Sequence, residues 1–194
     1  MEDEPLKAEH AIEEARALLN AAWHTVDEQR HNLLIAWARQ VLQPFVDAKH
    51  PEAIWVWSSF PEDMTERHTE EEFDRRHRLQ IETAAAAGHA GAKFWLACEL
   101  DEGPTLEKSA TLFKEAAELG YPKAKWCHGL NLLSGRGIKQ DKDLGMRFIL
   151  EAGRDKVEGA VEFLAHAYAT GSHGLSRDEK ESAAWWIKRK DKDL

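Results

Sequence analysis

A pattern of small residues recurs along the chain at intervals of 32 to 39 residues, and this repeat constrains the fold more than any other feature. The three clear copies are marked by Ala92, Ala124 and Ala160, which lie 32 and 36 residues apart. A fainter copy is marked by Ala53, 39 residues before Ala92. A period of this length fits a pair of helices, and it excludes a leucine-rich repeat or a heptad. The chain is therefore expected to consist of successive helix pairs.

Each clear copy carries the pattern of a first helix that begins at the small residue. Apolar residues follow at the three- and four-residue spacing of an amphipathic helix. They are Trp95, Leu96 and Leu100, then Cys127, Leu130 and Leu133, and finally Phe163, Leu164, Ala167 and Tyr168. Glycines then break the helix, and Asp141 and Asp178 are expected to cap the second helices. Second helices are predicted at about 105–119, 141–152 and 178–190.

The turn that leads from one helix pair to the next needs a residue in the left-handed backbone conformation, which glycine adopts without steric cost. Gly88 and Gly120 occupy this place in two of the copies. Lys156 occupies it in the third copy. That last turn is therefore expected to be built differently.

The first fifty residues continue the helical pattern without the markers of the repeat. Apolar spacing predicts helices over 6–23 and 33–45, with Asp27 as the cap of the second. The residues that carry this spacing include Trp23, Leu33 and Trp37. We interpret residues 1–50 as a degenerate or capping helix pair, because terminal repeats are usually atypical. The repeats themselves are expected in residues 51–194, with units at 51–88 (a weak unit with a long second helix over 66–87), 89–120, 121–156 and 157–190.

The central copy has a distinctive spacing of small and loop residues: Ala124, Gly129, Gly135, Gly137, Ile138 and Asp141. The third copy repeats it at Ala160, Leu164, Tyr168, Gly171, Gly174, Leu175 and Asp178, with one residue inserted in the loop, and the first copy keeps Ala92, Leu96 and Gly103. This spacing resembles the Sel1-like repeat, a relative of the tetratricopeptide repeat. The resemblance covers about residues 84–190 well and 28–83 weakly. It implies an all-α, right-handed superhelix, or solenoid, of about four stacked helix pairs.

Charge and cysteine content narrow the class of protein. Acidic residues outnumber basic ones by 35 to 26, for a net charge of −9, which disfavours nucleic acid as a partner because phosphates need a basic surface. The same charge favours a basic protein partner, although solubility alone also explains it. Cys98 and Cys127 lie in helical patterns and are expected to be buried, reduced thiols. Without a signal-peptide pattern or an apolar run of roughly 20 residues, a cytoplasmic protein that binds no membrane is expected.

The sequence carries no pattern typical of catalysis or metal binding. Its ten histidines form no His-Glu-x-x-His motif and no cluster with the cysteines. His10 and Glu14 form a helical pair of a kind that arises by chance in charged helices. Gly135-Arg136-Gly137 looks like part of a phosphate loop, but the motif's lysine and preceding strand are missing, and the repeat already explains its glycines. The chain is therefore expected to be no enzyme and to need no metal or cofactor.

Side chains in shared repeat positions are the candidates for a binding surface. Two places after the opening small residue, three copies have an aromatic residue and the fourth has a glutamate. Aromatic residues in one repeat position most often pack between adjacent units, but the first helices of such solenoids also line the concave surface. The predicted protein-binding residues are Trp55, Trp57, Phe94, Glu99, Trp126, His128, Asn131, Glu162 and His166.

Stacked helix pairs leave a curved surface suited to protein recognition, so a non-catalytic protein–protein interaction module is the expected function. Proteins similar to the Sel1-like repeat family act as adaptors in signalling and quality-control complexes, as host-interacting bacterial factors, and as immunity proteins that neutralise secreted toxins. The first hypothesis is a bacterial immunity protein, which would bind a toxin effector, with a basic one favoured by charge, and occlude its active site. The alternative is an adaptor or scaffold in a signalling or regulatory complex. The partner and the oligomeric state stay open.

Overall fold

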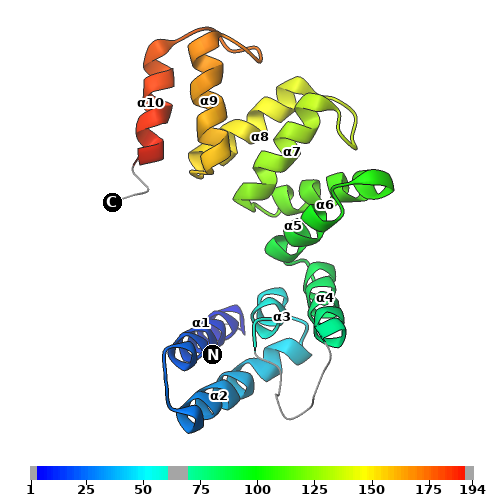
Figure 1. Cartoon of the computed structure of the whole chain (residues 1–194), viewed down its shortest axis with the longest axis vertical. Helices are drawn as coiled ribbons and strands as arrows, with labels where there is room; N and C mark the ends of the chain where they lie inside the picture. The colour runs from blue at the N-terminus through cyan, green and yellow to red at the C-terminus, as the bar shows by residue number, and fades with distance from the viewer. Residues whose placement is uncertain (1–3, 61–69, 191–194) are drawn as a thin grey trace. The chain divides into compact units, whose positions relative to one another are not determined.

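The computed structural model describes residues 4–60 and 70–190, and every regular element within them is a helix (Figure 1). The chain divides into two compact units, Met1–Ala92 (unit 1) and Lys93–Leu194 (unit 2). Unit 1 contains α1 (Glu4–Trp23), α2 (Glu28–Asp47), α3 (Pro51–Trp57) and α4 (Glu70–Ala86). The next helix, α5 (Ala90–Glu99), begins in unit 1 and continues into unit 2. Unit 2 then contains the 3-10 turn η1 (Gly103–Thr105), α6 (Leu106–Glu118), α7 (Pro122–Ser134), α8 (Lys142–Arg154), α9 (Glu158–Thr170) and α10 (Glu179–Lys190).

The helices agree closely with the periodicity of the sequence. The second helices predicted at 105–119, 141–152 and 178–190 are confirmed as α6, α8 and α10. The helix predicted over 66–87 is α4 from residue 70 onward, and residues 66–69 lie outside the described residues. The predicted repeat boundaries divide the chain more finely than the two compact units do, and they stay a prediction. In the described part of the chain, no helix is long and apolar enough to cross a membrane.

Unit 1 is held together by a core between α1, α2 and α3. Its buried residues are Ile12, Ala15, Leu19, Ala22, Ile35, Ala38, Leu42, Ala53, Val56 and Phe60. Alanines at the contacts between helices allow the helix axes to approach closely, and the longer side chains fill the space beside them. Asp27 caps α2 as predicted, since its carboxylate accepts a hydrogen bond from the backbone N–H of Arg30 at 3.0 Å.

Three large apolar side chains that follow the helical spacing in unit 1 lie on the surface. Trp23 is 61% exposed, Leu33 is 70% exposed and Trp37 is 52% exposed. The apolar face predicted from the spacing was therefore too wide. Within the described part of unit 1, the main contacts of α2 are with α1 and α3, and these two neighbours cover one stripe of its surface.

Unit 2 contains helix pairs whose backbones touch. A Cβ atom added to Gly129 of α7 would lie 2.7 Å from Cγ1 of Ile149, and one added to Gly145 of α8 would lie 2.8 Å from the Gly129 carbonyl oxygen. These glycines therefore let α7 and α8 pack at backbone distance. The buried residues of the next layer are Met146, Ile149, Ala152, Ala160, Val161, Leu164, Ala165 and Trp185. The helix-opening alanines Ala124 and Ala160 are fully buried, as their place in the repeat predicts.

Asp141 and Asp178 cap the second helices, as predicted. The carboxylate of Asp141 accepts a hydrogen bond from the backbone N–H of Leu144 at 3.0 Å. That of Asp178 accepts from the backbone N–H groups of Lys180 and Glu181, at 2.9 and 3.1 Å. These local bonds satisfy helix donors that would otherwise have no partner, so a cap is readable from sequence.

The turn at Lys156 is built like the glycine turns, so the prediction of a different turn was wrong. Lys156 has φ +60°, against +88° for Gly120. In both turns this residue's N–H donates to the carbonyl three residues earlier, and the next residue's N–H donates to the carbonyl five residues earlier. The surrounding hydrogen bonds thus hold a lysine in a conformation that costs a side chain about 1–2 kcal/mol.

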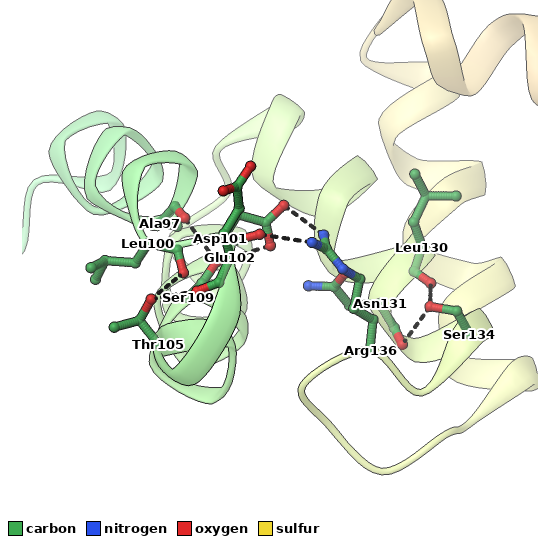
Figure 2. A network of polar contacts seen from close by, with 10 residues as sticks. All are labelled: Ala97, Leu100, Asp101, Glu102, Thr105, Ser109, Leu130, Asn131, Ser134 and Arg136. Carbon is green, nitrogen blue, oxygen red and sulfur yellow. Dashed lines mark hydrogen bonds and ion pairs between the residues drawn. The ribbon is translucent and has the colours of Figure 1, made fainter.

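Arg136 connects the loop between α7 and α8 to the preceding helix pair through hydrogen bonds (Figure 2). Its guanidinium donates to the Asp101 carboxylate at 2.6 Å and to the Asp101 carbonyl at 2.7 Å. The Ser109 hydroxyl donates to the Ala97 carbonyl at 2.7 Å and contacts the Asp101 carboxylate at 3.3 Å. Gly137 has φ +65°, and a Cβ there would lie 2.7 Å from the Leu106 carbonyl oxygen, so this position requires glycine.

Candidate functional site

A groove of about 550 Å³ lies in unit 2 where successive first helices begin. The beginnings of α7 and α9, the turns that precede them and one residue of α5 form its walls. Its lining residues are Phe94, Tyr121, Pro122, Lys123, Trp126, Cys127, Asp155, Lys156, Val157, Glu158 and Gly159. We call this the aromatic groove. It brings together two of the predicted binding residues, Phe94 and Trp126.

The repeat itself places aromatic side chains in the groove. A residue two places after the opening alanine lies about 200° further round the helix, because each residue advances by about 100°. Ala124 is fully buried against its neighbours, and Trp126 therefore faces the other way, toward the groove. Phe94 has the same place in α5, after the buried Ala92. Its ring lies 5.1 Å from that of Tyr121, centroid to centroid.

Trp126 packs closely against the start of α9 at Gly159. A Cβ atom added to Gly159 would lie 3.1 Å from Nε1 of the indole and 3.2 Å from its Cε2. The ring also packs edge-on against Phe163, with centroids 5.7 Å apart. The indole is half-buried, so one part of it stabilises the contact between repeats and another part stays accessible from the groove.

The acidic side chains of the groove are paired with basic ones. The Asp155 carboxylate accepts a hydrogen bond from Lys125 Nζ at 2.8 Å, and Glu151 lies 3.5 Å from the same nitrogen. The hydrogen bond to Asp155 raises the pKa of Lys125, and the charges of both acids add to this effect. Glu158 lies 3.4 Å from a guanidinium nitrogen of Arg189.

Two lysines line the groove without an acidic partner among the described residues, Lys123 and Lys156. Both side chains are exposed. Lys125 and Arg189 each serve two carboxylates, so the groove and the side chains paired with it carry four basic and four acidic groups, and their charges balance.

Three further predicted residues lie on the surface of unit 2 or close to it. Glu162 is half-buried and forms an ion pair with Arg189 at 3.0 Å. His166 is exposed, and its ring contacts the edge of Trp186 at a centroid distance of 5.4 Å. Glu99 is exposed at the end of α5. None of these three lines the aromatic groove.

His128 and Asn131 are buried, with 2% and 5% of their surfaces exposed. The His128 ring packs edge-on against Phe148, 4.8 Å away, and burial lowers its pKa. Within the described residues, neither His128 Nδ1 nor Asn131 Nδ2 has a hydrogen-bond partner. Buried polar groups without a partner destabilise the core around them. Because both side chains are buried, neither belongs to the surface that is available to a partner.

Trp55 and Trp57 lie in unit 1, and each packs against an aromatic neighbour. Trp55 stacks on the His89 imidazole, with centroids 4.7 Å apart and planes 17° apart. The His89 Nδ1 accepts from the backbone N–H of Ala92 at 3.0 Å, and its Nε2 contacts Glu52 at 2.9 Å. Trp57 packs against Phe60 at 5.3 Å and lines a shallow hollow beside α2.

Sequence reasoning missed four groove residues that come from the turns between helices, Tyr121, Asp155, Lys156 and Val157. The signal was present in part, because Tyr121 and Val157 both directly precede a first helix. The repeat pattern identifies residues inside helices, however, whereas this groove is lined largely by the two turns that precede α7 and α9.

The thiol of Cys127, which lines the groove, is shielded by burial. Burial raises the pKa of Cys127 to about 12, so its thiol is a poor nucleophile at neutral pH. Cys127 is half-buried, whereas Cys98 is exposed, so the prediction of two buried thiols was wrong for Cys98. No group of three or more metal-ligating side chains occurs in the residues that the structure describes.

Helix pairs that pack in succession, open on a buried alanine and are capped by aspartate define a class, the α-helical repeat proteins. Neither a family model nor a curated protein matches the sequence. Several solved structures match the fold, among them two repeat proteins. One is a Sel1 repeat protein from Oxalobacter formigenes, with a TM-score of 0.62 and 17% identity over 90% of this chain and 70% of that chain. The other is c5321, a protective antigen present in uropathogenic Escherichia coli strains and displaying an SLR fold, with a TM-score of 0.58 and 18% identity.

The match to c5321 covers 80% of this chain and 33% of that chain, so this chain spans about one third of its length. At sequence identities of 17% and 18%, these matches establish the fold alone. The chain has the Sel1-like repeat fold, and both the all-α fold class and the resemblance predicted from the spacing of Ala124, Gly129, Gly135 and Asp141 are confirmed at that level.

Proposed function

We propose that the chain is a non-catalytic protein-interaction module that holds a partner protein in the aromatic groove. The observation that carries this proposal is the convergence of Phe94, Tyr121 and Trp126 on one groove of about 550 Å³. Aromatic side chains in a partly covered pocket are the residues that contribute most to binding at protein interfaces. They offer a large apolar surface and lose little conformational freedom on binding.

The packing around the groove supports binding without rearrangement. Phe94 is braced by Phe113 and Tyr121, whose ring centroids lie 5.7 and 5.1 Å from its own. Trp126 is braced by Gly159 and Phe163. Because these contacts hold the rings in place before a partner arrives, the partner does not have to order them, and more of the contact energy goes into affinity.

Two more specific functions are compatible with this fold, and they differ in the kind of complex that the chain would form. An immunity protein would form one tight, stoichiometric complex with a toxin effector and occlude its active site. An adaptor or scaffold would form several weaker complexes. The net charge of −9 supports the immunity role, because it would steer a basic effector toward the chain.

The experiment that tests the proposal is a quantitative affinity capture from source-cell lysate with matched tryptophan variants. We expect the wild-type chain to capture at least one partner, and Trp126→Ala to lose it. Trp37→Ala is the control, because Trp37 is an exposed tryptophan of unit 1 and should leave the complex unchanged. Tyr121→Ala is a second groove variant, and circular dichroism verifies that each variant is folded.

The outcomes separate the possibilities. A single stoichiometric partner would support the toxin-neutralising role, and several sub-stoichiometric partners would support the adaptor. A complex that both groove variants retain would contradict the groove as the binding site. Capture of no protein by the wild-type chain would contradict the interaction module itself.

A further inference from the structure

We propose that a second copy of this chain docks on the outward face of α2, in an antiparallel, two-fold symmetric contact between the two α2 helices. The contact lies in unit 1 and is independent of the aromatic groove of unit 2, so it goes beyond the proposed function. It uses side chains that the core of a single chain leaves on the surface.

The outward face of α2 lies opposite the residues that the helix buries. Ile35, Ala38 and Leu42 are buried, and residues about half a turn away point to the other side of the helix. This outward face is a stripe with spacings of three and four residues, and all of its members are exposed: Leu33, Trp37, Gln40 and Pro44. Large apolar side chains that gather on one exposed helix face mark an interaction surface.

The middle of this face carries no charge. From residue 32 to residue 46, no exposed side chain of α2 is acidic or basic, although charged residues make up 31% of the chain. Arg39 is half-buried, and its guanidinium lies over the Phe60 ring, 5.8 Å from the centroid. A two-fold contact sets the residues near its axis against their own copies, so charged side chains there would repel each other. A neutral face with an exposed tryptophan is therefore suited to a second copy of the same chain.

The two halves of the face complement each other in shape. The first half carries the exposed Leu33 and Trp37, and the second half lines a shallow hollow of about 640 Å³ beside Trp57 of α3. The hollow is lined by Arg39, Gln40, Gln43, Pro44, Asp47 and Trp57. A two-fold axis between Ala38 and Arg39 sets Leu33 of each copy opposite Pro44 of the other, and Trp37 opposite Gln40. The large side chains of each copy then meet the hollow of the other, which is the self-complementarity that a two-fold contact requires.

The same axis pairs opposite charges at both ends of the contact. It sets Arg30 opposite Asp47 and, two positions further out, Glu28 opposite Lys49, and all four side chains are exposed. Asp47 accepts a hydrogen bond from the neutral amide of Gln43 at 2.8 Å, which leaves its charge available to a guanidinium. Each pairing occurs twice because of the symmetry. A parallel arrangement would instead set Arg30 against Arg30 and Asp47 against Asp47, so charge selects the antiparallel one.

The proline within α2 adds a polar feature to the face. Pro44 has no N–H, so the Gln40 carbonyl lacks the donor that a regular helix supplies four residues later. In the proposed contact, Trp37 of the second copy lies opposite Gln40. Its indole N–H needs an acceptor once the ring is buried, and this carbonyl is an acceptor without its usual donor.

The size of the contact sets the expected affinity. With 20 residues, α2 is about 30 Å long, and one helix face per copy is small beside the interface of a permanent dimer. We therefore expect a reversible dimer with a dissociation constant on the order of 10 µM.

The experiment is analytical ultracentrifugation of the full chain from about 1 to about 300 µM, a range that brackets this constant. We expect the mass of one chain at the lowest concentration and of two chains at the highest. Trp37→Ala should weaken the dimer about a hundredfold, because both copies lose the central anchor. Leu119→Ala is the control and should leave the dimer unchanged, because it removes an apolar side chain of similar exposure, 53% against 52%, from unit 2.

Charge reversal tests the pairing itself. Arg30→Glu and Asp47→Arg each set like charges opposite each other, so each variant alone should dimerise about tenfold more weakly than the wild type. In an equimolar mixture of the two variants, opposite charges face each other again at both ends. We expect this mixture to form a heterodimer about as stable as the wild-type dimer. Mixing would not repair a misfolded variant, so this result separates the contact from an effect on folding.

Three results would overturn the inference: a monomer at about 300 µM, an unchanged dimer in Trp37→Ala, or no gain in association when the two charge variants are mixed. The proposed function fails separately. If Trp37→Ala loses the dimer and still captures the partner, the α2 contact and the aromatic groove are both supported. If the dimer behaves as expected but Trp126→Ala and Tyr121→Ala retain the partner, the α2 contact stands and the groove is wrong.

Discussion

Gly145→Ala tests whether α7 and α8 really pack at backbone distance. The added Cβ would lie 2.8 Å from the Gly129 carbonyl oxygen, 3.1 Å from the Leu133 backbone nitrogen and 3.2 Å from the Leu132 Cβ. None of these atoms can move away by a change of rotamer, so the two helices must separate. Overpacking of this kind costs about 1–3 kcal/mol and loosens the contacts of Ile149, which is fully buried.

Helix propensity opposes this effect and makes the prediction sharp. Replacement of glycine by alanine inside a helix stabilises it by about 1 kcal/mol where space allows. Because the helices must also give up packed contacts, we expect the clash to exceed this gain, with a net destabilisation of unit 2 of up to about 2 kcal/mol. For a unit of this size the midpoint of thermal unfolding would fall by about 4 °C or more for each kcal/mol lost.

The assay is urea unfolding followed by circular dichroism, with the change in free energy taken from the midpoint of the unit 2 transition. Arg147→Ala is the control, since Arg147 is exposed on the same helix and should change stability by less than about 0.5 kcal/mol. A Gly145→Ala variant as stable as the wild type, or more stable, would refute the close packing of α7 and α8.

Three further predictions concern other contacts. Arg136→Ala should lower the stability of unit 2 by about 1 kcal/mol in the same assay, because it removes two charge-assisted hydrogen bonds at a half-exposed site; an unchanged midpoint would show that the loop is not held by Asp101. The hydrogen bond from His89 lowers the pKa of Glu52 below 4.5, so its stabilisation is present above pH 4.5 and is lost as the pH falls through the folded-state pKa. Glu52→Gln should therefore lower stability at pH 7 and reduce the loss of stability between pH 5 and pH 3, and an acid transition identical to that of the wild type would contradict this. Alkylation at pH 8 followed by mass spectrometry should modify Cys98 at least about tenfold faster than Cys127, whose pKa is raised by burial to about 12; equal rates would show that Cys127 is not protected.

Local signals made most of the helices predictable. Asp27, Asp141 and Asp178 identify helix starts because a cap is satisfied within three residues of itself, and no distant neighbour has to be known. Gly120 and Gly135 identify turns for the same reason, since positive φ is a property of one residue. The 32- and 36-residue spacing of the buried alanines then orders the helices into pairs.

What could not be predicted depends on neighbours that periodicity does not reveal. Trp23 and Trp37 follow the helical spacing but are exposed, because burial needs a second helix over that part of the face. Lys156 adopts a turn conformation that its own preference disfavours, because the backbone hydrogen bonds from Lys156 and Val157 to carbonyls of α8 impose it. His128 and Asn131 lie on a first helix as expected, yet neighbouring elements cover them.

The residues of the groove also divide into those that the sequence predicts and those that it does not. Phe94 and Trp126 were predicted because they occupy the same position in successive repeats. Their direction follows from the rotation of about 100° per residue along a single helix. Lys123 and Lys156 were not found, because the start of α7 and the turn before α9 line the same groove although these residues are 33 positions apart in sequence.

Hydrogen exchange of the chain, free and in complex with its captured partner, tests the central claim most directly. The account predicts slower exchange on binding in the two groove turns and the helix starts beside them, 120–127 and 155–161, while α1 and α2 of unit 1 stay unchanged. Protection confined to α1 and α2, with unchanged exchange at both groove turns, would contradict the aromatic groove as the binding site.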